Sequence, residues 1–349
     1  METLDICVAT HRIVKGNGID VSVLEFAREL SRQHNVTLAV TYTDGDAGGL
    51  EVVRYRISLR SGLLATSRDL ARRRFDLVST HYSPFDLAAS LSGLPHYLHD
   101  PGVPPFGLMK GAAGKYLWAA VNGGRLLSAR GARCVLPISD YLGREFRRKY
   151  LYGGPMETLP YGIDFPAALP DVPVPWDRYV LYVGRHIPYK GVDTLMEIFG
   201  EVKEELGDDV HLVTIGNCEE GYRRYLDRLS NKTGNVHMLG FVPEVWGYYA
   251  KASVYATCSR WEGQDRPVIE AQYASKPAVT FKNCSHPEVV EHGTLAENRS
   301  EFKDALVAYL GDRRPRPGIN DRILRKYSPE GMVRKFNGIV RDHRGPPAA

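Results

Sequence analysis

Two glutamates at a fixed spacing are the residues of this chain best suited to ligand chemistry. Glu262 lies in a Gly-containing loop within TCSRWEGQDRPVIEAQYASKPAV, and Glu270 lies eight positions later in a predicted helix with Pro in its first turn. Carboxylates accept hydrogen bonds from vicinal hydroxyl groups, so one acid can meet a sugar and the other a ribose. Taken alone, the spacing favours two solvated acids, because charged residues are mostly exposed.

The elements around the two glutamates predict where their side chains lie. The stretch 252–257 has the pattern of a buried strand and leads into the loop of Glu262. That loop leads in turn into the helix of Glu270. A loop between the carboxyl end of a strand and a helix N-terminus is where α/β folds bind anionic ligands. The two acids are therefore expected at a ligand-binding edge of a sheet.

Strand and helix patterns alternate twice along the chain, which predicts an α/β fold. Apolar residues at helical spacing follow the first strand and recur after residue 190. A proline-rich stretch, 165–176, separates the two series and is expected to be an interdomain linker. We expect two doubly wound Rossmann-like domains facing a central cleft lined by the carboxyl ends of their strands. Strands are expected at 4–10, 35–42, 76–80, 96–99, 134–138, 179–183, 211–215, 236–239, 254–257 and 278–281.

Length and composition bound the class of protein. A chain of 349 residues exceeds what one core usually organises, so two domains are expected. The 43% hydrophobic and 25% charged content is that of an ordinary globular protein. Neither a signal peptide nor an apolar run of membrane-spanning length is visible. The five cysteines are scattered and predict neither a disulfide framework nor a zinc site, so a cytoplasmic location is expected.

The net charge of +4 is carried by the first half of the chain. Residues 1–165 contain 20 Lys and Arg against 16 Asp and Glu, and the remainder contains 25 of each. The basic residues cluster in two stretches, which predicts either a solvated face or a surface for an anionic acceptor or the inner face of a membrane. No nucleic-acid-binding motif accompanies them. The clusters are Arg54, Arg56, Arg60, Arg68, Arg72, Arg73 and Arg74, and then Arg144, Arg147, Arg148 and Lys149.

Most of the chain resembles the retaining glycosyltransferases of family four (glycosyl transferases group 1), which have the GT-B fold. The Glu pair resembles the signature with which that family contacts its donor sugar. VLYVGRHIPYKGVDTLMEIF resembles its first C-terminal strand, turn and helix. GNGIDVSVLEFARELSRQHNVTL, ISDYLGREF, LPYGIDF and LGFVPEVWGYYAKASVYAT match further segments in the expected order. The resemblance implies an N-terminal acceptor-side domain at 1–165, joined by a C-terminal helix at about 328–343, and a donor-binding domain at 177–327.

The resemblance also implies roles for individual residues. Arg185 and Lys190 would clamp the donor diphosphate without a metal, and such fixed cations stabilise the charge of a leaving group. Glu262 would hold hydroxyls of the donor sugar, and Glu270 would hold the ribose. His99, which ends a predicted strand, resembles the histidine beside the donor sugar.

Glycines and neighbouring residues complete the expected donor site. Gly16 and Gly18 lie between the first strand and its helix, where they permit close approach of the backbone to a phosphate. Their spacing is not that of the dinucleotide fingerprint. Gly240 and Phe241 lie where related enzymes place the nucleotide base. Asp44 and Asp46 form a DxD in a Gly-rich loop and are interpreted as turn residues, so no metal site is expected.

One segment departs from the family pattern. Where many relatives have Glu-Gly-Phe-Gly, this chain has Glu262, Gly263, Gln264 and Asp265. An apolar ring and a glycine are thus replaced by polar side chains in the expected donor site. Asp265 adds a negative charge near the expected diphosphate, and Arg266 offsets it locally. The change predicts either an altered choice of donor or weaker catalysis.

The resemblance implies a hexosyltransferase that retains anomeric configuration and needs no cofactor, and the cysteine content favours a cytoplasmic location. Its donor would be a UDP- or GDP-linked sugar, and its acceptor a lipid-linked, small-molecule or other glycan acceptor. Two alternatives remain open. One is a nucleotide-sugar epimerase on the same GT-B architecture, and the other is a non-catalytic nucleotide-sugar-binding partner subunit.

Overall fold

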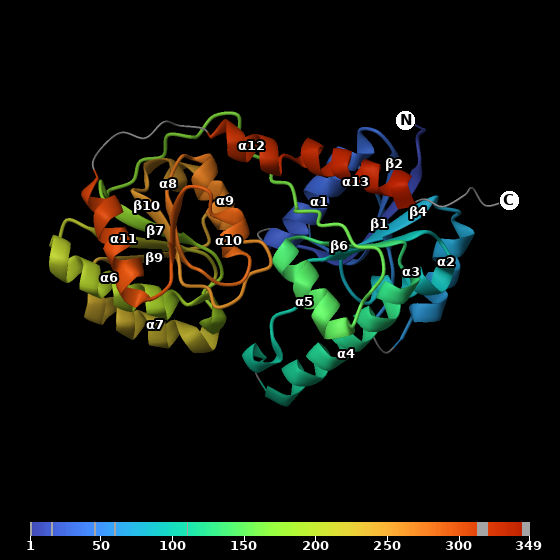
Figure 1. Ribbon diagram of the computed structural model, residues 1–349, viewed down its shortest axis with the longest axis horizontal. Coiled ribbons are helices and arrows are strands. Elements are labelled where there is room, and N and C mark those ends of the chain that lie inside the picture. The colour runs from blue at the N-terminus through green and yellow to red at the C-terminus, as the bar shows by residue number, and fades with distance from the viewer. Residues whose placement is uncertain are drawn as a thin grey trace. The chain divides into compact units, whose positions relative to one another are not determined.

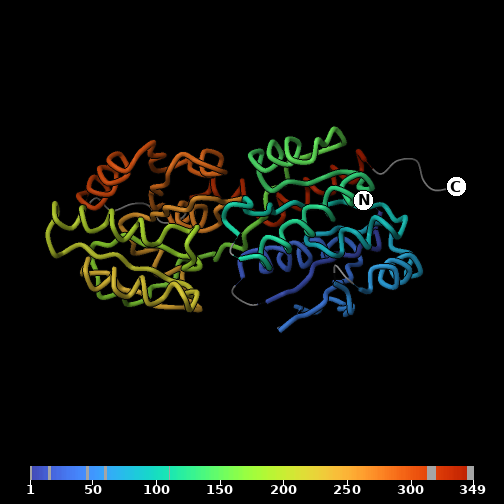
Figure 2. The backbone as a smooth tube through the Cα atoms, turned by 90° about the horizontal axis from the view of Figure 1, so that it is seen from below, coloured from blue at the N-terminus to red at the C-terminus, as the bar shows by residue number. Residues whose placement is uncertain are grey.

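The chain folds into two compact units. The computed structural model describes residues 2–14, 17–44, 47–58, 61–109, 111–312 and 320–343. Unit 1 comprises Met1–Asp164 and Tyr327–Ala349, and unit 2 comprises Phe165–Lys326. In Figures 1 and 2 the colour runs from blue to green through unit 1 and from yellow-green to orange through unit 2, and the red C-terminal helix belongs to unit 1 again.

Unit 1 is built on a six-stranded parallel sheet with the strand order β3-β2-β1-β4-β5-β6. Helices connect the successive strands from β3 to β6 and join β1 to β2, and the interiors of all these strands except the edge strand β3 are buried, as parallel sheets require. The strands are β1 (Asp5–Ile13), β2 (Asn35–Thr43), β3 (Glu51–Arg54), β4 (Leu77–Thr80), β5 (His96–Asp100) and β6 (Cys134–Pro137). The helices are α1 (Gly18–Ser31), α2 (Leu63–Arg72), α3 (Phe85–Ser92), the 3-10 turn η1 (Phe106–Leu108), α4 (Gly111–Gly131) and α5 (Asp140–Tyr150).

The C-terminal helix α13 (Pro329–His343) packs along α1 of unit 1 (Figure 1). The Phe336 ring meets the Phe26 ring edge-on at 5.1 Å between centroids, and His34 contacts the side chain of Asn337 at 3.2 Å. The last helical segment of the chain is therefore part of the core of the first unit.

Unit 2 repeats the architecture with the strand order β12-β11-β10-β7-β8-β9, again parallel throughout. The two doubly wound sheets confirm the predicted α/β fold class. The strands are β7 (Tyr179–Val183), β8 (His211–Ile215), β9 (Val236–Gly240), β10 (Val254–Thr257), β11 (Ala278–Phe281) and β12 (Gly293–Ala296). The helices are η2 (Pro188–Lys190), α6 (Val192–Leu206), α7 (Glu220–Thr233), α8 (Trp246–Lys251), α9 (Arg266–Tyr273), α10 (His286–Val289), α11 (Arg299–Gly311) and α12 (Asp321–Tyr327).

The proline-rich stretch 165–176 has no regular secondary structure. Its two aromatic residues pack on unit 2. Phe165 stacks on Tyr273 with 4.3 Å between ring centroids, and Trp176 lies 4.5 Å from the ring of His237. The segment expected as a linker thus contributes side chains to the second unit, because its aromatic rings bury apolar surface there.

No helix in the described part of the chain combines the length and the apolarity needed to cross a membrane.

Candidate functional site

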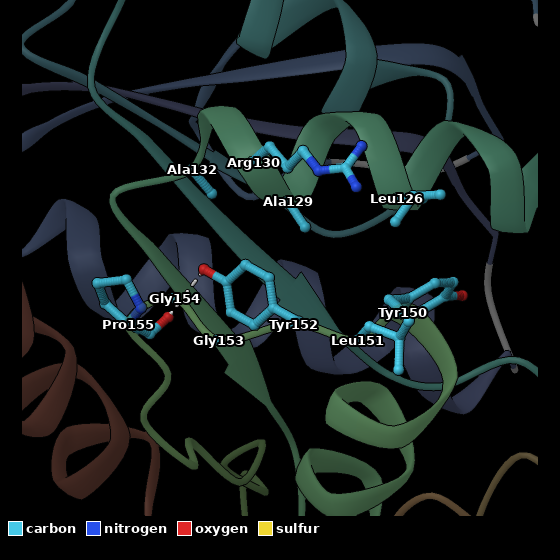
Figure 3. Close-up of a pocket in the computed structure, with 10 residues that line it drawn as sticks. All are labelled: Leu126, Ala129, Arg130, Ala132, Tyr150, Leu151, Tyr152, Gly153, Gly154 and Pro155. Carbon is cyan, nitrogen blue, oxygen red and sulfur yellow. Dashed lines mark hydrogen bonds between the residues drawn. The ribbon is translucent and has the colours of Figure 1, made fainter.

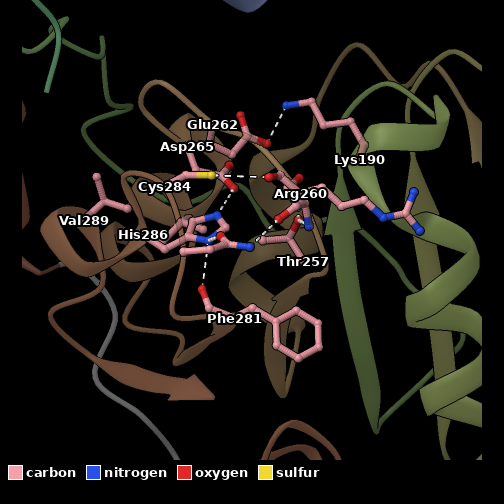
Figure 4. Close-up of polar contacts among 12 residues, drawn as sticks. Lys190, Thr257, Arg260, Glu262, Asp265, Phe281, Cys284, His286 and Val289 are labelled. Carbon is pink, nitrogen blue, oxygen red and sulfur yellow. Dashed lines mark hydrogen bonds and ion pairs between the residues drawn. The ribbon is translucent and has the colours of Figure 1, made fainter. Parts of the chain in front are cut away.

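A buried ion pair joins two of the predicted site residues in unit 2 (Figure 4). The Nζ atom of Lys190 lies 2.5 Å from Oε1 of Glu262. The side chains are 20% and 8% exposed, respectively. Lys190 ends η2 after β7, and Glu262 lies in the loop after β10, the strand next to β7 in the sheet. The pair therefore stands at the carboxyl edge of the sheet, where the sequence places ligand chemistry.

Backbone contacts between the two loops bring the ion pair together. Gly191 has a φ of +66°, and a Cβ atom there would lie 2.1 Å from the carbonyl oxygen of Cys258. The Arg260 N–H donates to the Tyr189 carbonyl at 2.8 Å, and its guanidinium donates to the Pro188 carbonyl at 2.8 Å. Only glycine allows this approach, so the turn after Lys190 packs directly on the loop that carries Glu262.

Burial and neighbouring charges set the proton balance of the pair. Burial raises the pKa of the Glu262 carboxyl, the nearby Asp265 raises it further, and Lys190 opposes both. For Lys190, burial opposes the charge, but the carboxylates of Glu262 and Asp265 outweigh burial and raise the pKa of the ammonium. The Lys190 amine therefore stays protonated at neutral pH. Two acids share its charge, so Glu262 holds a proton more readily than a solvated glutamate does.

Glu270 is held by two side chains of unit 2. Its Oε2 accepts a hydrogen bond from the Tyr249 hydroxyl at 2.9 Å, and its Oε1 lies 2.7 Å from Nε of Arg266. Arg266 opens α9 and Glu270 follows one turn later, so the two face each other at i and i+4. Pro267 lies in the first turn, as predicted. The acid expected to hold a ribose is therefore pre-positioned by an arginine at a helix N-terminus.

Asp265 is 3% exposed and is paired with a residue that the motif search missed. Its Oδ2 lies 3.0 Å from Nε2 of His286, which is fully buried at the start of α10 (Figure 4). The histidine lies 21 positions further along the chain, beyond the next strand. The contact forms because β10 and β11 are neighbours in the sheet, which places the loops after them side by side. No local spacing in the sequence predicts it.

Tyr189 links the two predicted cations. The exposed Arg185 donates to the Tyr189 hydroxyl at 3.3 Å, and Lys190 Nζ lies 5.8 Å from the centre of the same ring. Arg185 and Lys190 thus flank one aromatic side chain at the carboxyl end of β7. Sequence reasoning passed over this tyrosine, although its place between two candidate cations was a signal.

Glycines line the carboxyl ends of β7, β8 and β9. The Gly216 N–H donates to the Gly240 carbonyl at 2.7 Å, and a Cβ atom on Gly216 would lie 2.1 Å from the Gly184 carbonyl oxygen. Gly240 has open space around its Cα, and the next residue, Phe241, is 50% exposed. Gly263 is buried and Gln264 is half-buried. The backbones of these turns thus pack closely on one another, and open space remains beside Gly240.

His99 does not lie where its expected role requires. It lies one residue before the end of β5, near the carboxyl edge of the unit 1 sheet, but its side chain has no exposed surface. Its ring stacks on His81 with 4.0 Å between centroids, and Phe26 and Phe336 cover it. Burial holds the pKa of His99 well below its usual range. A side chain without accessible surface cannot touch a sugar, so direct contact between His99 and a donor is not supported by this structure. The cause is packing of α1 and α13 over β5.

The other unit 1 candidates lie at the N-terminus of α1 or beyond the described residues. Gly18 is the first residue of α1, and a Cβ atom there would meet nothing within 4 Å. Gly16, Asp46 and Arg60 lie outside the described residues. Asp100, next to His99, forms a buried ion pair with Arg125 of α4.

A cavity of about 280 Å³ lies away from these residues, between the C-terminal part of α4 and the segment 150–155 (Figure 3). Because α4 ends just before β6 begins, the cavity lies toward the amino end of that strand. Tyr150, Leu151 and Tyr152 line it with Leu126 of α4, and Arg130 is the one charged residue among its lining. None of the predicted site residues lines it.

Two doubly wound units, each with a parallel six-stranded sheet, define the GT-B class of two Rossmann-like domains. The family model of glycosyl transferases group 1 matches residues 177–312, and the model of glycosyltransferase family 4 matches residues 16–165. This protein belongs to the group 1 glycosyltransferases. The resemblance seen in the sequence is thereby confirmed at the level of the family.

Known proteins resemble the chain at low identity. The O-antigen chain mannosyltransferase B of Escherichia coli is 25% identical over 205 residues, which are 52% of this chain and 52% of that protein. The match thus spans about half the length of that curated relative. HepE of Anabaena, solved with UDP and glucose, superposes with a TM-score of 0.73 at 15% identity, over 97% of this chain and 99% of that one. WaaG, a glycosyltransferase of lipopolysaccharide biosynthesis, gives 0.69 at 16% identity over 95% of each chain.

Proposed function

We propose that this protein is a retaining glycosyltransferase that moves a sugar from a UDP- or GDP-linked donor to a lipid-linked or other glycan acceptor. The observation that carries the proposal is the Lys190–Glu262 pair at the carboxyl edge of the unit 2 sheet. Membership of the family and the UDP and glucose held by HepE support a nucleotide-sugar donor. The name of the Escherichia coli relative supports a glycan acceptor.

The charged pairs of unit 2 suit the parts of such a donor. Lys190 and Arg185 would meet the diphosphate from either side of Tyr189, where fixed cations stabilise the leaving group without a metal or cofactor. Glu262 would turn from Lys190 toward the sugar hydroxyls. Glu270, pre-positioned by Arg266, would accept hydrogen bonds from the ribose.

Donor binding tests this function directly. The thermal unfolding midpoint would be followed with UDP, GDP, ADP and their sugar conjugates, on the wild type and on Lys190→Ala and Glu270→Ala. A ligand at a hundred times its Kd stabilises the fold by about 2.7 kcal/mol. We expect one nucleotide series to stabilise the wild type and neither variant. Lys203→Ala is the matched control, because Lys203 is 23% exposed and also ion-paired, but at the far end of α6.

A protein that binds no nucleotide would contradict the proposal. A donor epimerised without an acceptor would favour an epimerase, and tight binding without turnover on any glycan acceptor would favour a partner subunit. Retention is tested separately by the anomeric configuration of the product. An inverted product would leave the transferase assignment standing and remove the retaining mechanism.

An apolar surface on unit 1 supports a membrane-linked acceptor. Tyr116, Leu117 and Leu127 of α4 are 60%, 56% and 62% exposed, and Leu151 beside the cavity is 91% exposed. Basic side chains of α4 and α5 accompany them, and Lys149 lies 4.3 Å from the Trp118 ring. Exposed apolar side chains near basic ones suit the interface of an anionic bilayer. We propose that unit 1 lies against the membrane through this surface, at its cytoplasmic face.

Liposome sedimentation tests this surface. The wild type would be compared with Leu117→Asp and Leu127→Asp on vesicles with increasing anionic lipid. Tyr225→Asp is the control, because Tyr225 is 40% exposed but lies on α7 of unit 2. We expect both α4 variants to sediment less and the control to match the wild type. Wild-type sedimentation that does not depend on anionic lipid would remove the membrane proposal.

A further inference from the structure

Asp265 and His286 form a buried polar pair in a loop that carries the proposed donor site. Asp265 lies just before α9, at the end of the loop after β10. Its side chain is 4% exposed, and that of His286 is fully buried. A buried carboxylate without a partner is costly, so the contact with His286 offsets the cost of burying Asp265.

The contacts of the imidazole show how its protons are arranged. Nδ1 of His286 lies 3.0 Å from the carbonyl oxygen of Phe281 and 2.9 Å from Oδ1 of Asn283. A carbonyl only accepts, so Nδ1 must donate. Nε2 then faces the carboxylate of Asp265 at 3.0 Å, and that contact is attractive only with a proton between the two atoms. The imidazole therefore offsets part of the negative charge of Asp265.

The same two loops are joined at two further points. The side-chain amide of Asn283 donates to the Ser259 carbonyl at 3.2 Å. The Cys284 thiol donates to the Arg260 carbonyl at 3.3 Å (Figure 4). The loop after β11 thus holds the loop after β10 along its length. The Asp265–His286 contact is the innermost of these ties and lies three residues from Glu262.

We propose that His286 is a positioning residue of the donor site: by pairing with Asp265 it offsets the charge of that carboxylate and holds the loop of Glu262 in its binding conformation. The inference rests on the proposed function. His286 touches neither the donor nor the acceptor in this scheme, and it acts through Asp265.

Several titratable groups face the pair and would respond to its loss. Lys190 and Glu262 sense the charge of Asp265 from η2 and from the loop after β10. Asp265 also contributes to the raised pKa values of three buried tyrosines, after burial itself, which is the main cause. These are Tyr182 on β7, Tyr249 on α8 and Tyr255 on β10. An uncompensated Asp265 would compete with the donor diphosphate for Lys190.

Charge compensation predicts a specific pattern among variants. His286→Leu removes the partner and leaves the carboxylate buried, so kcat/KM should fall by about a hundredfold. Asp265→Gly in the His286→Leu background removes that carboxylate as well and should recover at least about tenfold of the loss. His286→Gln retains a side-chain donor toward Asp265 and should stay within about tenfold of the wild type.

The experiment measures binding of UDP and GDP by titration calorimetry and the initial rate of sugar transfer for all four proteins. Failure of the wild type to bind either nucleotide would overturn the proposed function. With a binding-competent wild type, the inference fails if His286→Leu matches it or if the second substitution rescues nothing. Should His286→Leu not fold, His286→Gln and the double variant decide. Folded, active proteins support the inference, and folded but inactive ones overturn it.

Discussion

At the scale of single residues, the candidate site is a set of acid and base pairs. Lys190 pairs with Glu262, Arg266 with Glu270, and His286 with Asp265. Each acid exposes less than a tenth of its surface to solvent, so each partner offsets the cost of desolvating a carboxylate. Because the cations are already in place, an anionic donor meets fixed charges rather than mobile ones.

Removal of the Lys190 charge should weaken donor binding and also slow the transfer step. Lys190→Ala leaves Glu262 buried without its cation and takes a fixed charge from the leaving diphosphate. We expect kcat to fall by about 100- to 1000-fold. Steady-state rates with saturating donor measure this effect, and Lys203→Ala should retain the wild-type rate. Equal losses in the two variants would point to general destabilisation of unit 2.

Removal of the Asp265 charge should move the acid limb of the pH profile. Burial first, and Asp265 second, raise the pKa of Glu262. If the ionised Glu262 binds the sugar, activity falls as pH drops through that pKa. Asp265→Asn removes one raising influence, so the limb should shift to lower pH, as measured by kcat/KM from pH 4 to 8. An unmoved limb, or a shift upward, would contradict the role of Glu262.

At the scale of elements, glycine turns decide how closely the loops approach. Gly191 ends η2 and begins α6, and its positive φ lets the turn pack on the loop after β10. Helix α9 then begins with a proline in its first turn, and the i, i+4 spacing of Arg266 and Glu270 places them on one face of it. The turn, the loop and the helix together set the positions of the charged pairs.

A methyl group at Gly191 should therefore cost both stability and activity. In Gly191→Ala the Cβ atom would clash with the Cys258 carbonyl, and φ would be strained. We expect the free energy of unfolding to fall by about 1–3 kcal/mol, with weaker nucleotide binding. Denaturant unfolding and calorimetry measure the two effects. Gly221→Ala is the control, since it lies in α7 with nothing within 4 Å and should be neutral or stabilising.

At the scale of the whole molecule, buried histidines make the fold sensitive to acid. Burial lowers the pKa of His81 and of His96 in unit 1 to about 3, from an ordinary 6.5. In unit 2, burial lowers the pKa of His186 to about 4. These imidazoles are neutral in the native state. They gain protons on unfolding, so stability is full above pH 6.5 and falls as pH drops below it.

Each buried imidazole should cost roughly 2 kcal/mol at pH 5 relative to pH 7.5. His99, next to His81, adds to the effect in unit 1. We therefore expect unit 1 to lose stability first on acidification. Urea unfolding at the two pH values measures this loss, with hydrogen exchange to assign it to a unit. Unfolding midpoints that do not change between pH 7.5 and 5 would show that these histidines carry protons in the native state.

The sequence alone determined the class of fold, most strands and the elements that carry the charged residues. Apolar runs and helical spacing reflect burial, which a local pattern records. The edge strands β3 and β12 were not predicted from the sequence, because they are short and only partly buried. The tertiary structure decided which residues meet. It paired Asp265 with His286 and covered His99 with α1 and α13, since strand order and distant helices bring together residues that no local spacing connects.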